Sequence, residues 1–79
     1  MKVLLFARAR DLAGVGEIDI DIPASGRVAD LRRALGERLP NLASFLRHCA
    51  VAVNDEYATD DAVLSTEDRV ALLPPVSGG

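Results

Sequence analysis

Hydrophobic and polar residues alternate in two segments near the N-terminus, a pattern that is typical of β-strands. The first segment, residues 2–9, begins with an apolar run. In the second, residues 17–22, acidic residues and isoleucines strictly alternate, which predicts a strand with one buried face. Residues 13–16 between them contain two glycines, which favour a turn. Together these segments predict an N-terminal β-hairpin.

The middle of the chain has helical periodicity instead. Apolar residues recur on one side of a helix drawn through residues 28–39, and arginine and glutamate occupy other positions. This pattern predicts an amphipathic helix that ends before Pro40. Asn41 is of a residue type that caps helices, and it precedes the apolar residues of segment 42–46. A second, short helix with Asn41 as its N-cap is therefore predicted.

The C-terminal part of the chain predicts short strands joined by turns. Residues 50–53 are expected to form one strand, and Asn54-Asp55 favours a tight turn after which residues 56–58 return briefly. Residues 63–66 predict an irregular connection. The last strand is expected at residues 69–73, with apolar side chains on both of its faces.

This order of elements predicts the fold class. An α+β domain with a mixed sheet of about four to five strands, and with one main helix and a short second helix on one face, is the economical arrangement for such a chain. The order is that of the β-grasp, or ubiquitin-like, fold. A chain of this length forms one domain. We expect a β-grasp domain over residues 1–74 and a flexible C-terminal Gly-Gly tail over residues 75–79.

Composition and charge exclude several classes of function. Of the 79 residues, 49% are hydrophobic and 27% are charged, as in globular proteins rather than disordered ones. The net charge is −3 and Lys2 is the only lysine, so nucleic-acid binding, which needs a basic patch, is not expected. No apolar stretch approaches the length of a membrane-spanning helix. Cys49, the single cysteine, has no partner for a disulfide or a metal site. We expect a cytoplasmic protein without a bound metal or cofactor.

The end of the chain carries the most distinctive chemistry of the sequence. Pro74 and Pro75 favour an extended backbone, and Gly78 and Gly79 lack a Cβ atom, so this end is thin enough to enter a narrow active site. The terminal carboxylate is a poor electrophile, but an ATP-dependent partner enzyme can adenylate it. Sulfide attack would then give a thiocarboxylate that delivers sulfur, whereas amine attack would give an isopeptide tag. The alternative is a frayed, inert terminus.

Three blocks of the sequence resemble the MoaD family, the small subunits of molybdopterin synthase. The C-terminal block, DRVALLPPVSGG at residues 68–79, is the most specific. Residues 5–14 resemble the family's first strand and following turn, and residues 51–57 resemble its central hairpin. The blocks have the family's order and spacing, so the resemblance covers essentially the whole chain. Glu67, where the family pattern has glycine, is a departure that concerns the geometry of one turn.

This resemblance implies a sulfur carrier in molybdenum cofactor biosynthesis. A MoeB-like enzyme would use ATP to adenylate Gly79, and a sulfurtransferase would convert the adenylate into a thiocarboxylate. The tail, with Gly78 and Gly79 at its reactive end, would enter a MoaE-like large subunit in a heterotetramer and donate sulfur to cyclic pyranopterin monophosphate. The chain would be the sulfur-donating subunit of molybdopterin synthase and not catalytic alone.

The resemblance also implies a docking surface for these partners. Phe6, Tyr57 and Leu73 are expected on the sheet face away from the helix, and the matching positions of the family meet the large subunit and the activating enzyme. The expected partner-binding residues are Phe6, Tyr57, Leu73, Pro74, Pro75, Val76 and Ser77. The alternative for Phe6 and Leu73 is a place in the hydrophobic core, because a small domain needs its large apolar side chains there.

The remaining polar residues predict no second site. The adjacent carboxylates of Asp60-Asp61 and Glu67-Asp68 lie in expected loops and are interpreted as solvated turns. His48, the only histidine, is expected at the surface or at a strand edge. Cys49 is expected to be a small buried apolar residue.

Three other functions stay open at this point. A ThiS-like sulfur carrier for thiamin synthesis has the same fold and Gly-Gly end, but the Pro-Pro-Val block and the extra helical segment fit it less well. A ubiquitin-like protein modifier would be detected through isopeptide conjugates. A β-grasp interaction module with an inert tail would keep its function after removal of Gly79.

Overall fold

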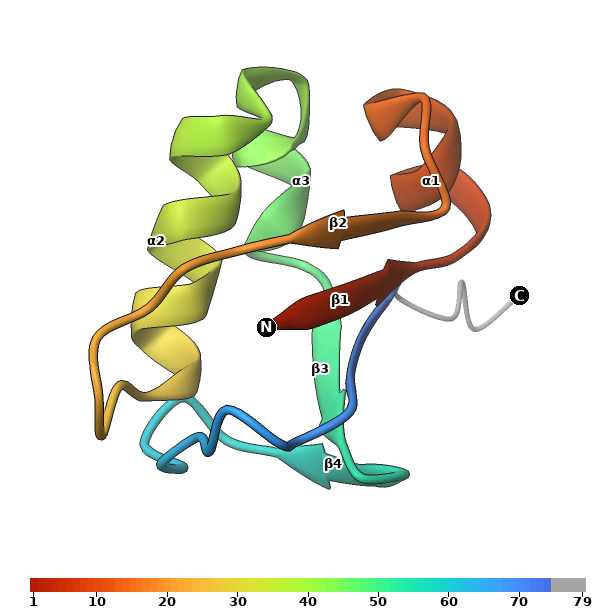
Figure 1. Ribbon diagram of the computed structural model, residues 1–79. Helices are drawn as coiled ribbons and strands as arrows, with labels where there is room; N and C mark the ends of the chain where they lie inside the picture. Colours follow the sequence, from red (N-terminus) through yellow and green to blue (C-terminus); the bar gives the residue numbers. More distant parts are fainter. Residues whose placement is uncertain (75–79) are drawn as a thin grey trace.

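A computed structural model describes residues 1–74, which contain nine short helices and strands (Figure 1). In chain order these elements are β1 (Lys2–Leu5), α1 (Ala7–Ala13), β2 (Glu17–Asp19), α2 (Val28–Arg38), η1 (Pro40–Leu42), α3 (Ala43–Leu46), β3 (Ala50–Val53), β4 (Glu56–Ala58) and β5 (Val70–Leu73). The element η1 is a single 3₁₀ turn that leads from α2 into α3. The chain thus alternates between sheet and helix, as expected for an α+β domain.

The strands form one mixed sheet in the order β2-β1-β5-β3-β4. The last strand, β5, lies in the centre, parallel to β1 on one side and antiparallel to β3 on the other. The outer pairs, β1 with β2 and β3 with β4, are antiparallel. An N-terminal hairpin, a helix and a final strand that returns beside β1 make up the predicted β-grasp, which is confirmed.

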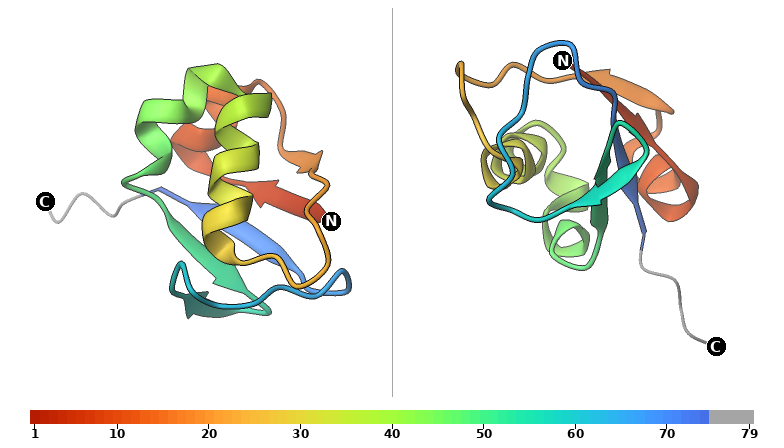
Figure 2. Two further views of the ribbon diagram at one scale, coloured as in Figure 1. Left: turned by 90° about the vertical axis from the view of Figure 1, so that its left-hand side faces the viewer. Right: turned by 90° about the horizontal axis from the view of Figure 1, so that it is seen from below.

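The hydrophobic core lies between one face of this sheet and helices α2 and α3, which stand side by side against it (Figure 2). Alternate residues of each central strand are buried because successive side chains of a strand point to opposite faces. The sheet contributes Val3, Leu5, Val51, Val70 and Leu72, and the helical layer contributes Val28, Leu31, Leu35, Leu42 and Leu46. The opposite face of the sheet therefore carries the other half of the strand residues.

The prediction of a strand over residues 2–9 is wrong beyond Leu5. Ala7 has a φ of 50°, and this bend ends β1 and starts α1. Three small or apolar residues at helical spacing, Ala9, Leu12 and Ala13, face the core from this helix. Gly14 ends it with a φ of 78° and donates its N–H to the Arg10 carbonyl, because glycine adopts the left-handed conformation without a steric penalty.

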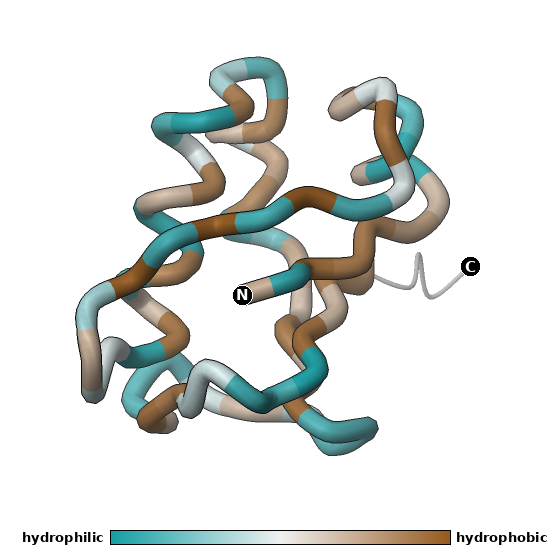
Figure 3. Tube along the Cα trace, in the orientation of Figure 1, coloured by the Kyte–Doolittle hydropathy of each residue, from teal (hydrophilic) through white to brown (hydrophobic). Residues whose placement is uncertain are grey.

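The second predicted strand is also shorter than its pattern. Hydrophobic and hydrophilic positions alternate along β2 and beyond it (Figure 3), but β2 ends at Asp19. The Ile20 N–H still bonds to the carbonyl of Met1, the residue that precedes β1, at 2.9 Å. Beyond this point the segment after β2 has no neighbouring strand, so hydrophobic and polar residues still alternate there but without backbone hydrogen bonds between strands.

The helix predicted over residues 28–39 is confirmed, and it ends before Pro40. The Asp30 carboxylate accepts the Arg27 N–H at 2.8 Å and so holds the first turn. The prediction of Asn41 as an N-cap is wrong, because Asn41 lies inside η1 and no side chain caps α3. Proline is preorganised for the first turn of a helix, so helical backbone begins one residue earlier, at Pro40.

Gly36 is an interior residue of α2, and replacing it should stabilise the protein. A Cβ atom at this position would lie 3.6 Å from Leu46 and 3.8 Å from Ala43, at ordinary van der Waals distances. We expect Gly36→Ala to raise the free energy of unfolding by about 0.5–1 kcal/mol, since alanine loses less backbone entropy in a helix. Urea unfolding followed by circular dichroism checks this, and a lower midpoint than that of the parent chain would contradict it.

Within residues 1–74, no helix is long and apolar enough to cross a membrane.

Candidate functional site

A row of four side chains crosses the sheet on the face away from α2 and α3. The strand registers pair Leu4 with Ala71, Ala71 with Ala52, and Ala52 with Tyr57. These four residues therefore come from β1, β5, β3 and β4 but lie side by side. The two central residues are alanines, whose side chains project less from the sheet than those of Leu4 and Tyr57 at the two ends of the row.

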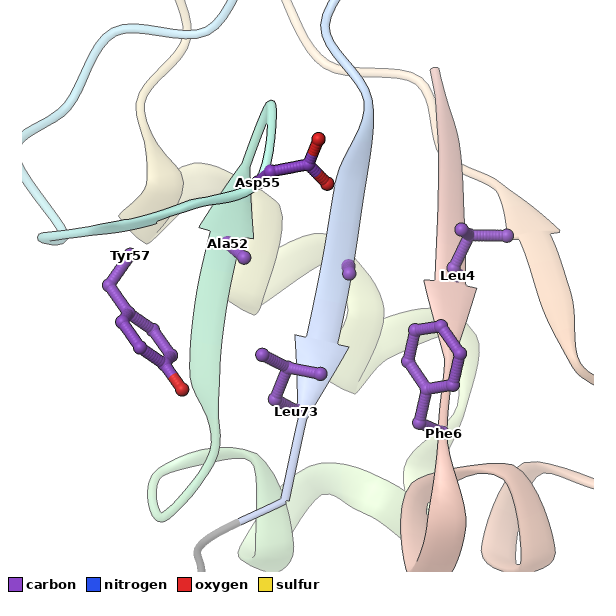
Figure 4. A pocket seen from close by; sticks show the side chains of 7 residues that line it. Leu4, Phe6, Ala52, Asp55, Tyr57 and Leu73 are labelled. Atoms are coloured by element: carbon purple, nitrogen blue, oxygen red, sulfur yellow. The ribbon is translucent and has the colours of Figure 1, made fainter.

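Phe6 and Leu73 extend this row into a hollow (Figure 4). Because β1 and β5 are parallel and Leu5 pairs with Leu72, the next residues of both strands lie at the same end of the sheet. The resulting groove has a volume of about 350 Å³ and is lined by Leu4, Phe6, Ala52, Asp55, Tyr57, Ala71 and Leu73. We call it the apolar groove.

The large side chains of the apolar groove are unusually accessible. Tyr57 is 76% exposed, Phe6 45% and Leu4 37%. Large apolar residues that gather on one exposed surface mark sites of protein interaction more often than isolated ones do. Aromatic residues flanking a shallow hollow are also typical anchors of protein interfaces. The groove is therefore suited to receive apolar side chains of a partner.

A polar turn closes one end of the apolar groove. Asn54 and Asp55 connect β3 to β4 with φ values of 53° and 71°, the left-handed pair that asparagine and aspartate tolerate. Asn54 exchanges two hydrogen bonds with the Arg69 backbone, at 2.8 and 2.9 Å. The Asp55 carboxylate lies 2.8 Å from the Arg69 guanidinium. These bonds join the hairpin that carries Tyr57 to the start of β5.

The structure places Phe6, Tyr57 and Leu73 together on the face away from the helices, as the sequence predicts. The alternative that Phe6 and Leu73 belong to the hydrophobic core is wrong, since neither is buried. Pro74 follows directly and is half-buried. Their role in partner binding stays a prediction. The predictions for Pro75, Val76, Ser77, Gly78 and Gly79 lie outside the described residues.

Sequence reasoning missed four residues of the groove: Leu4, Ala52, Asp55 and Ala71. A signal was present for two of them, because Leu4 shares the alternation of Phe6, and Ala71 shares that of Leu73. The strand order was also needed, since only the pairing of β5 with both β1 and β3 brings Ala71 beside Leu4 and Ala52.

Comparison with known proteins assigns the family. Residues 3–79 match the ThiS family. The chain belongs to the ThiS family. A molybdopterin synthase sulfur carrier subunit from Arabidopsis thaliana is 41% identical over 80 residues, which cover 100% of this chain and 82% of the plant protein. The resemblance to the small subunits of molybdopterin synthase is thereby confirmed.

Solved structures of other proteins resemble this ThiS-family chain closely. SAMP1 from Haloferax volcanii has a TM-score of 0.88 at 31% identity, over 99% of this chain and 97% of that one. Subunits 1 and 2 of the molybdopterin-converting factor from Helicobacter pylori have been solved as a complex, in which the matching chain has a TM-score of 0.68 at 28% identity. That match covers 99% of this chain and 96% of the Helicobacter chain.

The nucleophilic residues of this ThiS-family chain do not form a catalytic pair among the described residues. Cys49 is buried, and its Sγ lies 3.5 Å from the Phe45 carbonyl. Burial raises the pKa of the Cys49 thiol, although the Arg32 charge partly opposes this. His48 is exposed, as expected. Residues 1–74 contain no cluster of three or more histidine, cysteine or carboxylate side chains that could hold a metal.

The four loop carboxylates are not all free in solvent. Asp61 and Glu67 are exposed, as expected. Asp60 instead accepts a hydrogen bond from Arg32 Nε at 2.7 Å. Asp68 is half-buried and accepts hydrogen bonds from the Ser65 N–H of its own turn and from the Asn54 amide of the turn between β3 and β4. The interpretation as a solvated turn holds for Asp60, which stays exposed while it pairs with Arg32, and it is wrong for the half-buried Asp68. Both residues tie their loops to neighbouring elements.

Asp68 should make the stability of the fold sensitive to acid. The Ser65 N–H at 2.7 Å, and then the Asn54 amide at 3.0 Å, hold the pKa of this carboxyl below its ordinary value of 3.8. A lowered pKa in the folded state gives stability that is present above the unfolded pKa and is lost as pH falls through the folded one. We expect the parent chain to lose more stability than Asp68→Asn between about pH 5 and pH 2. Urea unfolding across this range checks it, and parallel profiles would contradict it.

Proposed function

We propose that this chain is the sulfur carrier subunit of a molybdopterin synthase. The observation that carries the proposal is the apolar groove at the end of β5, from which the chain continues into a sequence ending in Gly78-Gly79. The name of the Arabidopsis relative supports the same function. A surface that docks a partner and a reactive terminus that follows it in the sequence are the two parts that a carrier needs.

The proposed chemistry takes place at the Gly79 carboxylate. One carboxylate oxygen attacks the α-phosphorus of ATP, and pyrophosphate leaves. A sulfur nucleophile then attacks the acyl carbon and AMP leaves, so Gly79 ends as a thiocarboxylate. Its sulfur passes to cyclic pyranopterin monophosphate, and Gly79 returns to a carboxylate with an oxygen from water. Two such transfers supply the two sulfur atoms of the dithiolene.

The proposal assigns the other steps to partner proteins. A MoeB-like enzyme holds ATP, a sulfurtransferase supplies the sulfur, and a MoaE-like large subunit binds the pterin in a heterotetramer with this chain. A large-subunit partner is supported by the Helicobacter complex of subunits 1 and 2. Phe6, Tyr57, Leu73 and the residues of the tail are the proposed contacts, and the cytoplasm is the proposed location.

A reconstituted reaction tests the first half of the proposal. The chain is incubated with ATP, sulfide and a MoeB-like enzyme, and intact-protein mass spectrometry with fragmentation locates any replacement of oxygen by sulfur. Fragmentation is needed because oxidation of Met1 or Cys49 changes the mass by nearly the same amount. We expect the change at Gly79. A terminal carboxylate that stays unmodified would overturn the sulfur-carrier function.

The second half of the proposal is tested with the acceptor. Thiocarboxylated protein is mixed with a MoaE-like subunit and cyclic pyranopterin monophosphate, and molybdopterin is measured after oxidation to its fluorescent derivative. We expect molybdopterin in an amount that is limited by the thiocarboxylate supplied. Sulfur delivery to the thiamin thiazole precursor instead would assign the chain to thiamin synthesis.

A protein modifier is the second candidate, and the similarity to SAMP1 favours it. A related structure carries the name small archaeal modifier protein 1, and the TM-score to SAMP1 is 0.88. Because Arg69 is the last basic residue of the chain, trypsin would leave residues 70–79 attached to a modified lysine. A search of host peptides for lysines that carry this remnant tests the candidate, and their absence under conditions that give a thiocarboxylate would exclude it.

A further inference from the structure

Charge is distributed unevenly along this acidic chain. Residues 27–48, which form the helical layer, carry five arginines and only two carboxylates. The rest of the chain carries four basic residues and ten carboxylates. By sequence the helical layer has a net charge of +3 and the remainder −6. Because Asp60 of the remainder pairs with Arg32, a net charge of +2 is left in this layer. A local field of this sign attracts negatively charged groups even though the whole chain is acidic.

A hollow in the helical layer gathers three of these arginines. It lies between α2 and α3, which stand side by side on one face of the sheet (Figures 1 and 2). Its volume is about 320 Å³. It is lined by Arg32, Arg33, Gly36, Ala43, Leu46 and Arg47. We call it the basic groove, and it faces away from the apolar groove because the sheet separates the two.

The three arginines of the basic groove are not equivalent. Arg32 is fixed, since its Nε bonds to Asp60 at 2.7 Å and its Nη1 bonds to the Leu46 carbonyl at 2.7 Å. Arg33 is 72% exposed and makes one long ion pair, with Asp30 of its own helix at 3.7 Å. Arg47 is exposed and makes no ion pair within residues 1–74. Two guanidinium groups are thus available beside a fixed one.

The floor of the basic groove is kept low by Gly36. A Cβ atom would fit there at 3.6 Å from Leu46 and 3.8 Å from Ala43. The fold alone would therefore be more stable with alanine, which is favoured over glycine inside a helix by about 1 kcal/mol. Glycine leaves the space beside Leu46 and Ala43 open, in a groove whose lining also includes Arg33 and Arg47. The open space at Gly36 and the positive charge of the arginines thus both favour a negatively charged group from another molecule.

We propose that the basic groove docks an acidic segment of a partner protein, with glutamate or aspartate side chains held by Arg33 and Arg47. Guanidinium groups bind carboxylates through two parallel hydrogen bonds. A segment of this kind lies along the helices and leaves the apolar groove and the end of β5 accessible. The chain then binds two partners at once, through opposite faces. This interaction does not depend on the sulfur-carrier function.

The test uses a short polyglutamate peptide as the probe and a polyglutamine peptide of equal length as its control. ¹⁵N–¹H correlation spectra of the full chain are recorded at low ionic strength during the titration. We expect polyglutamate to shift the amide signals of Arg33, Gly36, Ala43 and Arg47, and we expect polyglutamine to shift none of them. Shifts confined to other regions would overturn the proposal.

Two variants separate binding from folding. Arg33→Glu combined with Arg47→Glu should weaken polyglutamate binding by at least about tenfold, whereas Arg8→Glu combined with Arg10→Glu changes the net charge equally and should weaken it far less. Gly36→Ala should weaken binding about threefold while it stabilises the fold. Equal losses in the two double variants would overturn the proposal. So would tighter binding of inorganic phosphate or of oligothymidylate than of polyglutamate at equal ionic strength.

Discussion

One alanine appended after Gly79 is expected to abolish sulfur transfer while leaving the fold intact. The added residue moves the terminal carboxylate by about 3.5 Å along the extended chain and places a Cβ atom at the reactive end. Misplacement of reacting atoms by about 1 Å can cost about 100-fold in rate, so we expect at least that loss. Thiocarboxylate formation and molybdopterin production measure it, and thermal unfolding reports the fold.

The matched control is an alanine added before Met1, which lengthens the chain equally but leaves Gly79 at the terminus. This variant should be adenylated and should transfer sulfur at the parent rate. If the C-terminally extended chain also did so, neither the position of the terminal carboxylate nor the glycine that carries it would be required for sulfur transfer.

Two neighbouring leucines of β5 should behave in opposite ways. Leu72 is completely buried between the sheet and the helices, so Leu72→Ala should cost about 3 kcal/mol of unfolding free energy. This is a large part of the about 4–12 kcal/mol expected for a chain of this size. Leu73 is half-buried on the other face, in the apolar groove. Leu73→Ala should therefore cost less than about 1 kcal/mol of stability.

Binding should show the reverse order for these two variants. Leu73→Ala removes a wall of the apolar groove and should weaken binding to a MoaE-like subunit by about tenfold or more, while folded Leu72→Ala should bind nearly as well as the parent chain. Urea unfolding and isothermal titration calorimetry measure the two effects. A Leu73→Ala chain that unfolds readily but binds normally would assign Leu73 to the core and remove it from the proposed interface.

Local patterns predicted most of the elements correctly, and the largest error has a non-local cause. The helix at 28–38 and the turn at Asn54-Asp55 are determined by neighbouring residues, through periodicity and turn preference. The strand predicted over residues 2–9 is too long because residues 7–9 fit the period of a strand and that of a helix. Alanines at alternate positions suit a strand, whereas Ala9, Leu12 and Ala13 also form a helical stripe. Burial of Ala9 in the core favours the helix over the strand, and burial depends on contacts with segments that are distant in the sequence.

The apolar groove could be predicted only in part for the same reason. Alternation shows that Leu4 and Phe6 share a face of β1, and that Ala71 and Leu73 share a face of β5. Which strands are neighbours is decided by the sheet as a whole. The pairing of β5 between β1 and β3 places two alanines at the centre of the row. Because their side chains are small, the surface is hollowed there.

The sequence by itself determined the β-grasp order of elements, the burial of Cys49 and the Gly78-Gly79 end of the chain, because these depend on residue type and on spacing along the chain. The tertiary structure decided that residues 7–13 are helical, that Leu4, Ala52, Asp55 and Ala71 complete the apolar groove, and that Arg33 and Arg47 flank a second groove on the other side. Each of these depends on contacts between segments far apart in the chain, and packing against the sheet selects among conformations that local preference leaves nearly equal in free energy.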